Sequence, residues 1–133
     1  MERDSQRVSE AAYERDAFGR AMDTITFEDF LKVDVRVGRV LEAAESTKAR
    51  KPAYRLRVDF GPKLGVKTSS AQVTDHYTPE QLVGRQVLAV VNFPPRQVAD
   101  VRSEVLVLGV VLEDESVVLV RPDREVPVGV RFL

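Results

Sequence analysis

Apolar residues along the chain fall into short runs that predict a protein built mainly of β-strands. At 33–37 and at 54–60, apolar and charged residues alternate, which is typical of strands with one buried face. The continuous runs at 87–91 and 105–108 are β-branched or leucine-rich and too short for buried helices, so we interpret each as a strand covered on both faces. A strand with few large apolar residues is expected at 66–73. The last strands are expected up to residue 111 and at 117–120.

Two short helices are predicted from capping residues. Thr26 can cap a turn at 27–31, with Asp29 completing a variant of the capping box. The second helix follows the third strand and has a complete signature. Its cap, first position, box partner and stop are Thr78, Pro79, Gln81 and Gly84.

The order of three strands, a short helix and further strands predicts an all-β protein, a five-stranded Greek-key barrel of the OB-fold type. The helix between strands three and four would plug one end of the barrel. Gly38 interrupts the alternation of the first strand, and we interpret it as a β-bulge. An SH3-like barrel competes, but it does not normally place a capped helix there. The domain is expected over 26–133, after an extension at 1–25 that is either a marginal helix or disordered.

A polar hinge separates the two continuous apolar runs and contains Asn92, Phe93, Pro94, Pro95 and Arg96. Consecutive prolines lack backbone N–H groups and fix φ, so they force the chain out of the sheet. A stiff loop that presents Phe93 and Arg96 at the rim of the barrel is therefore predicted as the place where a partner binds. Packing of Phe93 in the core or at a dimer interface is the alternative.

The net charge of −1 conceals an uneven distribution. Residues 46–102 hold ten lysines and arginines against four aspartates and glutamates, whereas the flanking segments are acidic. This basic stretch either forms a surface attractive to phosphate or acidic peptide, or consists of ordinary solvated positions.

Composition argues against catalysis and metal binding. The chain has no cysteine and a single histidine, which excludes disulfides and thiol chemistry and predicts no metal site and no cofactor. His76 beside Asp75, with Ser69 near in sequence, is the one combination suggestive of a nucleophile and base, but adjacent residues rarely orient as a triad. No apolar run of about 18 residues is present and the N-terminus lacks the pattern of a signal peptide. A cytoplasmic, non-enzymatic protein without a membrane partner is therefore expected.

Six segments of the sequence closely resemble the CsaA family. They are DVRVG at 34–38, KPAY at 51–54, DFG at 59–61, SSAQVT at 69–74, VNFPPR at 91–96 and SEVLVLG at 103–109. The resemblance spans about 27–133 and implies an OB-fold homodimer, an export-related chaperone that binds unfolded precursor proteins. The wider superfamily comprises stand-alone tRNA-binding proteins and the C-terminal tRNA-binding domains of some methionyl-tRNA synthetases, which bind the outside of tRNA and catalyse nothing.

One departure helps to choose between these functions. The tRNA-binding relatives tend to carry Ser-x-Gly-Met where this chain has Ser103, Glu104, Val105 and Leu106. Glu104 would repel phosphate if it faced the binding surface. We therefore favour a non-catalytic, CsaA-like chaperone for unfolded or precursor polypeptides delivered to export machinery, with a structure-directed tRNA-binding protein as the alternative.

The binding site for peptide or tRNA is expected on the strands and the hinge. The predicted site residues are Arg36, Lys51, Tyr54, Lys67, Ser69, Ser70, Gln72, Asn92, Phe93, Arg96, Ser103 and Glu104. The cationic members offer phosphate contacts, and an exposed Tyr54 or Phe93 would stack a base. The strand phase of Tyr54, shared with Leu56, favours core packing instead.

A homodimer interface is predicted at Phe27, Phe30 and Leu31. One helical turn before the first strand cannot plug a barrel that the helix at 78–83 already plugs, so its apolar side chains should cover a surface shared with a second copy. The apolar C-terminal residues 126–133 are expected to contribute to the same surface.

Overall fold

The computed structural model describes residues 23–133, and the chain divides into two compact units, Met1–Lys32 and Val33–Leu133. In the first unit, helix α2 (Phe27–Leu31) begins at Thr26 with the predicted capping box. The Asp29 N–H donates to Thr26 Oγ1 at 3.1 Å, and the Thr26 N–H donates to Asp29 Oδ2 at 3.3 Å. The prediction for 1–25 falls almost wholly outside the described residues, and the predicted domain boundary at residue 26 stays a prediction.

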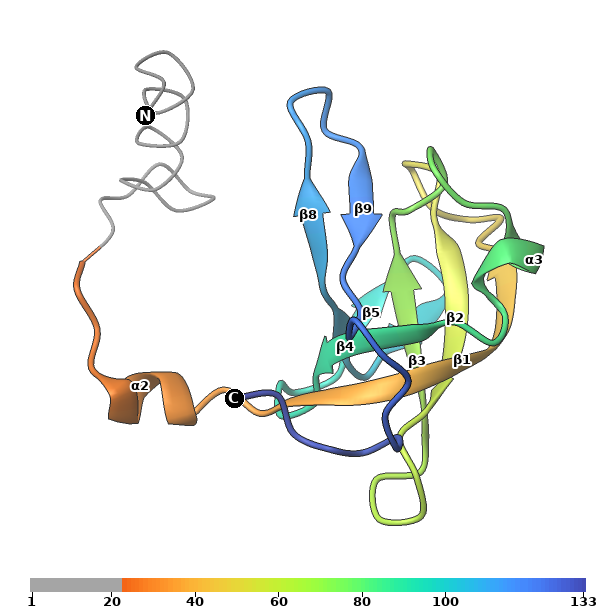
Figure 1. Cartoon of the computed structure of the whole chain (residues 1–133). Coiled ribbons are helices and arrows are strands. Elements are labelled where there is room, and N and C mark those ends of the chain that lie inside the picture. Colours follow the sequence, from red (N-terminus) through yellow and green to blue (C-terminus); the bar gives the residue numbers. More distant parts are fainter. Residues whose placement is uncertain (1–22) are drawn as a thin grey trace. The chain divides into compact units, whose positions relative to one another are not determined.

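The second unit is a nearly closed, five-stranded antiparallel barrel with the sheet order β3-β2-β1-β4-β7 (Figure 1). Helix α3 lies between β3 and β4, and two smaller hairpins, β5–β6 and β8–β9, complete the unit. This arrangement confirms the predicted OB-fold class. The elements are β1 (Val35–Glu45), β2 (Tyr54–Asp59), β3 (Val66–Ala71), α3 (Pro79–Leu82), β4 (Gln86–Val90), β5 (Arg96–Val98), β6 (Val101–Ser103), β7 (Leu106–Val107), β8 (Gly109–Val111) and β9 (Val117–Leu119).

Strand β1 is shared by two neighbours and bends between them. Its first half pairs with β4 and its second half pairs with β2. The register to β2 shifts between Val40 and Glu42, which places a bulge at Leu41. Because a bulge increases the local twist, it lets one long strand curve around the barrel.

The predicted bulge at Gly38 is wrong, because Gly38 pairs in regular register with Val87. Close packing is the reason for this glycine. A Cβ atom at residue 38 would lie 2.5 Å from Val58 Cγ1 and 2.7 Å from Phe60 Cε1. The break in the apolar pattern therefore marks a position where side chains of β2 and of the residue after it press against the backbone of β1.

The barrel core is filled from every strand of the main sheet and from α3. Tyr54 belongs to it, with its side chain buried and its hydroxyl donating to the Tyr77 carbonyl at 2.7 Å. Burial raises the pKa of the Tyr54 phenol. Leu82 of α3 is fully buried and belongs to the same core cluster, while the prediction that α3 plugs one end of the barrel stays a prediction. The buried cluster comprises Val40, Tyr54, Leu56, Val58, Phe60, Ala71, Val73, Leu82, Val87, Ala89 and Val105.

The two continuous apolar runs differ in burial and in strand pairing. All five residues of β4 are buried, which confirms the prediction of a strand covered on both faces. The prediction for 105–108 is wrong, because only Leu106 and Val107 pair with β4 and Leu106 is 48% exposed. At Gly109 the chain leaves the barrel sheet and forms the hairpin β8–β9, which extends away from the barrel (Figure 1).

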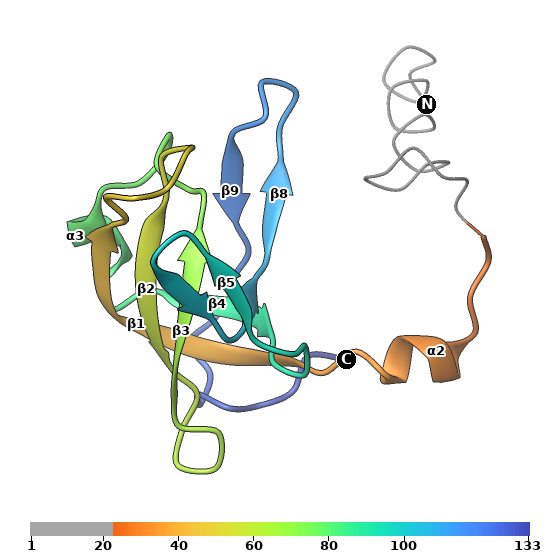
Figure 2. The same ribbon diagram turned by 180° about the vertical axis from the view of Figure 1, so that it is seen from behind.

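The prolines of the hinge end the sheet as predicted, but the chain then forms a hairpin that the sequence pattern did not indicate. Strands β5 and β6 pair from Arg96 to Ser103 around a turn in which Ala99 has φ +53°. The hairpin packs beside β3 (Figure 2). Along the chain, this hairpin lies between the hinge and β7. Its residues Arg96 and Val98 form part of the surface around the hinge.

Residues after β9 run back along β4 and β1 (Figure 1). The Leu88 N–H donates to the Val120 carbonyl at 3.3 Å, and the Val37 N–H donates to the Val130 carbonyl at 3.0 Å. Arg36 belongs to this contact, because it pairs with Asp34 at 2.7 Å and donates to the Gly129 carbonyl at 3.1 Å.

Candidate functional site

A groove of about 800 Å³ lies beside the hinge. One side is formed by the hinge and β5, another by the end of β3, and the base by the stretch from Ser103 to Gly109. The lining residues are Ser70, Ala71, Gln72, Val73, Phe93, Pro94, Pro95, Arg96, Val98, Ser103, Glu104, Val105, Leu106, Val107, Leu108, Gly109, Val111 and Val117. Most of them are apolar, so the groove suits an apolar ligand.

The groove begins where the seam of the barrel ends, the seam being the line of hydrogen bonds between β3 and residues 103–104. Strands β3 and β7 are the two outer strands of the sheet. Residues 103–104, which come shortly before β7 in the chain, make hydrogen bonds to β3. The Glu104 N–H donates to the Thr68 carbonyl at 2.7 Å, and the Thr68 N–H donates to Glu104 Oε1 at 3.0 Å. The Ser70 N–H donates to Ser103 Oγ at 3.1 Å. Side chains thus substitute for a missing strand partner along β3.

Beyond Ser70 the seam opens. Gln72 is the first residue after β3, and it lines the groove. Within residues 23–133, the backbone and side chain of Gln72 make no hydrogen bond, and Gln72 is exposed. The groove therefore holds free hydrogen-bonding groups just past the end of β3.

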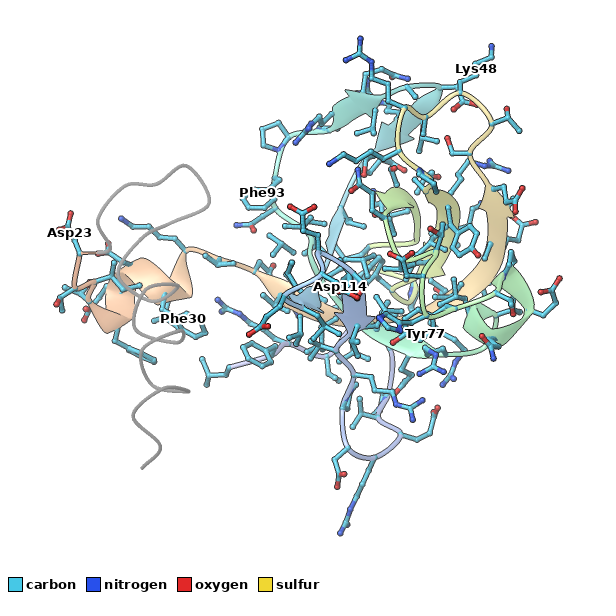
Figure 3. All side chains as sticks on the ribbon, turned by 90° about the horizontal axis from the view of Figure 1, so that it is seen from above. Asp23, Phe30, Lys48, Tyr77, Phe93 and Asp114 are labelled. Carbon is cyan, nitrogen blue, oxygen red and sulfur yellow. The ribbon has the colours of Figure 1, made fainter. Side chains whose placement is uncertain are left out.

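Apolar side chains line the same groove. Phe93 is 50% exposed on the loop between β4 and β5, at the outer rim of the barrel (Figure 3). Pro94 and Pro95 follow it and are exposed. Leu106, on the short strand β7, is 48% exposed. Large apolar side chains held in water by a stiff loop and a strand are available for burial against a ligand.

The groove has one exposed cationic side chain and one engaged carboxylate. Arg96, the first residue of β5, is exposed, whereas Glu104 is half-buried with its carboxylate held by the Thr68 N–H. Glu104 therefore stabilises the barrel seam, because its carboxylate accepts a hydrogen bond from the β3 backbone.

The structure brings half of the predicted site residues together. Those that line the groove are Ser70, Gln72, Phe93, Arg96, Ser103 and Glu104. Ser103 and Glu104 act there chiefly by holding the seam. Phe93 is exposed, so the alternative that it is a core residue is wrong.

The other six do not line the groove. Tyr54 and Ser69 are buried in the barrel, so the prediction that Tyr54 stacks a ligand is wrong. Arg36 is tied to Asp34 and to the C-terminal segment. Asn92 Oδ1 accepts from the Asp34 N–H at 3.0 Å, so it anchors the hinge. Lys51, in the loop before β2, and Lys67, on β3, lie outside the groove.

Sequence reasoning missed the apolar base of the groove, chiefly Leu106 and Val98. Leu106 stands in a run that had every mark of a buried strand. The available signal was Gly109, which leaves no room for a side chain because a Cβ there would clash with Val117 Cγ1. At this residue the chain passes from the barrel sheet to the hairpin β8–β9.

The catalytic alternative finds no support. Ser69 Oγ donates to the Ser70 carbonyl at 3.1 Å, and His76 Nε2 lies 2.8 Å from Ser116 Oγ instead. The Ser116 hydroxyl donates to Asp114 Oδ1 at 2.5 Å, and this hydrogen bond lowers the pKa of Asp114. Because that proton is directed to Asp114, Ser116 accepts from His76, and the imidazole is not placed to remove a proton from the hydroxyl.

Two observations concern the described part of the chain alone. Between residues 23 and 133, no three His, Asp or Glu side chains come together in a way that could hold a metal ion. In the same stretch, no helix has the length and apolar content needed to cross a bilayer.

The role of Glu104 in the seam can be tested by substitution. Glu104→Ala leaves the Thr68 N–H without its acceptor and should lower the free energy of unfolding by about 1–3 kcal/mol. Glu104→Gln keeps an acceptor oxygen and should lose clearly less. Urea unfolding of both variants measures the difference. Equal losses, or no loss in either, would show that the carboxylate does not hold β3.

Comparison with known proteins places this fold and groove in context. Residues 35–131 match the tRNA_bind family, described as "Putative tRNA binding domain". The chaperone CsaA of Bacillus anthracis is 53% identical with a TM-score of 0.79, over 84% of this chain and 100% of that one. The CsaA chaperone of Picrophilus torridus is 45% identical with a TM-score of 0.77, over 83% of this chain and 100% of that one.

Synthetases form the second group of relatives. The methionine–tRNA ligase of Porphyromonas gingivalis is 43% identical over 107 residues, 80% of this chain. The chain spans about 15% of the length of that enzyme. A MetRS-related protein from Pyrococcus horikoshii is 31% identical with a TM-score of 0.75, over 84% of this chain and 100% of that one.

Proposed function

The chain belongs to the CsaA and tRNA-binding OB-fold family, and we propose that it is a non-catalytic chaperone that holds non-native polypeptide segments in the groove beside Phe93. The observation that carries this proposal is the combination of exposed apolar side chains with unpaired hydrogen-bonding groups at Gln72, just after β3. Unfolded chains offer both complementary features, namely exposed apolar side chains and free backbone groups. Similarity to chaperones named CsaA supports the same choice.

The groove suggests how such a segment binds. An extended peptide pairs with the chain at Gln72, just after β3, through backbone hydrogen bonds, which do not depend on its sequence. Every second side chain of the peptide then lies against Phe93 and Leu106. This mode accepts many sequences, provided that they are extended and apolar, as a chaperone requires.

The cellular setting follows from the resemblance to the CsaA family. We infer a cytoplasmic protein whose clients are precursor polypeptides destined for export. We also infer a homodimer, because two symmetry-related grooves raise the avidity for one long unfolded chain.

The dimer interface is expected on α2. Phe27 is 62% exposed, and its ring centroid lies 6.5 Å from that of Phe30. Replacing both by serine should give a monomer in sedimentation velocity, because an aromatic ring exposed as Phe27 is makes a typical interface anchor. Val110→Ser, at another exposed apolar position, is the control and should stay dimeric. A double variant that sediments like the wild type would rule out this interface.

Binding of tRNA is the second candidate function. The matched family and the synthetase relatives favour it, and Arg96, Lys67 and Lys51 are available for phosphate contacts. The carboxylate of Glu104 accepts a hydrogen bond from the Thr68 N–H. It should therefore repel a phosphate group less than its place in the sequence predicts.

Titrations with an unfolded precursor peptide and with bulk tRNA, each at two salt concentrations, distinguish the two functions. We expect peptide binding that changes little with salt, because apolar burial dominates it. Arg96→Gln with Lys67→Gln should reduce the salt slope of any tRNA binding by about one unit for each lost phosphate contact. Arg57→Gln is the matched control, since Arg57 already pairs with Glu42 at 3.1 Å. Tight tRNA binding without measurable peptide binding would overturn the chaperone proposal.

A further inference from the structure

A second depression, of about 250 Å³, lies between the start of β4 and the loop that follows β9. Three arginines line it, Arg85, Arg121 and Arg124, together with two acidic residues, Asp123 and Glu125. It shares no lining residue with the groove beside Phe93. Three cationic side chains gathered in one small polar depression repel one another unless an anion lies between them.

Arg85 is fixed in place with an unused donor. Its guanidinium lies 5.1 Å from the centroid of the Tyr77 ring, a stacking contact that sets the plane of the group. Its Nε atom is buried and has no hydrogen-bond partner within the described residues. Because this Nε–H is shielded from solvent, a ligand in the depression can contact Arg85 only through its terminal Nη atoms.

The charges around Arg85 do not cancel. Glu125 is already engaged, because Arg39 donates to its two carboxylate oxygens at 2.9 Å and 2.6 Å and lowers its pKa. Between residues 23 and 133, the side chains of Arg121 and Arg124 make no ion pair and no hydrogen bond. Asp123 is then the single acidic side chain facing three arginines.

The loop that carries Arg121 and Arg124 is held against the barrel. Gln86 is 5% exposed, and its side-chain amide donates to the Val126 carbonyl at 2.6 Å and accepts from the Val126 N–H at 3.2 Å. This double hydrogen bond and the pair between Arg39 and Glu125 hold the C-terminal end of the short segment 121–126, and the hydrogen bond from the Leu88 N–H to the Val120 carbonyl holds the residue before it. The arginines are thus presented from an anchored loop, which lowers the entropic cost of ligand binding.

We propose that this depression binds a phosphate group, held by the guanidinium groups of Arg85, Arg121 and Arg124. Arginine suits this ligand because its planar set of N–H donors matches phosphate oxygens. The group can belong to a small phosphorylated molecule or to the backbone of a nucleic acid. The site is independent of the polypeptide groove and does not rest on the proposed chaperone function.

Calorimetric titration of the full chain with inorganic pyrophosphate at low salt tests the site. The wild type should bind, and Arg121→Gln with Arg124→Gln should weaken binding at least tenfold, while thermal unfolding stays close to that of the wild type. Arg57→Gln, at a paired surface arginine, should bind like the wild type. No binding by the folded wild type, or equal weakening by the control, would overturn the proposal.

A parallel titration with tRNA identifies the source of the phosphate. If the double variant also loses tRNA affinity, the site holds a backbone phosphate of RNA. If tRNA affinity is unchanged while pyrophosphate binding is lost, the site serves a free phosphorylated molecule. Both results support the arginine site, and each assigns its ligand.

Discussion

Phe60→Ala should lower the free energy of unfolding by about 3–5 kcal/mol, the usual cost of deleting a buried phenylalanine ring. Phe60 is 1% exposed, and three parts of the barrel meet at it. Its N–H donates to the Gly65 carbonyl at 3.0 Å, its ring faces Gly38, and its own carbonyl lies against Gly129, where a Cβ would approach to 2.6 Å. Removing the ring leaves a cavity that this crowded backbone cannot fill by collapse.

A double-mutant cycle with Gly38→Ala makes this prediction specific. Alone, Gly38→Ala should cost about 1–3 kcal/mol through overpacking, because its Cβ would meet the Phe60 ring and Val58. With Phe60→Ala the contact to the ring is gone, so the same substitution should cost less, by about 0.5–1 kcal/mol or more. Urea unfolding of the four proteins gives the coupling. Strictly additive losses would show that the ring is not what requires glycine at residue 38.

Phe93→Ala should weaken peptide binding by about 1–3 kcal/mol, because an aromatic side chain buried on binding is a typical anchor of an interface. Its stability should change little, since half of the side chain is already exposed. Any tRNA binding should fall less, because phosphate contacts do not involve the ring.

Leu112→Ala is the matched control, as Leu112 is 40% exposed and lies outside the groove. It should bind peptide like the wild type. Thermal unfolding of both variants must accompany the titrations. A Phe93→Ala protein that is destabilised but binds normally would remove the central residue of the peptide groove.

Local features were predictable from sequence where short-range chemistry decides the structure. Both capping boxes, at Thr26 and Thr78, formed as expected because each needs residues only three positions apart. The phase of Tyr54 along its strand indicated its burial. The buried strand β4 followed from its continuous apolar run.

Features that depend on distant partners were not predictable. Leu106 and Val107 have the composition of core residues, but β7 is only two residues long, because the chain leaves the sheet at Gly109. The position of the bulge in β1 depends on how two different neighbours share the strand. No local pattern reports either fact.

The same distinction explains the site. The hinge at Phe93 was identified because prolines act on the chain locally. Arg36 was misjudged as a ligand contact because its partner, the Gly129 carbonyl, lies 93 residues further along the chain. Glu104 lines the groove as predicted, but its contact with Thr68 was not predictable because it arises only when the barrel closes.

The location of a bound peptide tests the central claim most directly. Amide chemical shifts of the isotopically labelled protein can be followed by NMR while an unfolded precursor peptide is added. We expect the largest changes at Gln72, Phe93 and Leu106, with new hydrogen-exchange protection of the Gln72 N–H as the peptide pairs with the chain just after β3. Changes that spare these residues, or that fall only around Arg85 and Arg121, would contradict the assignment of the groove as the polypeptide site.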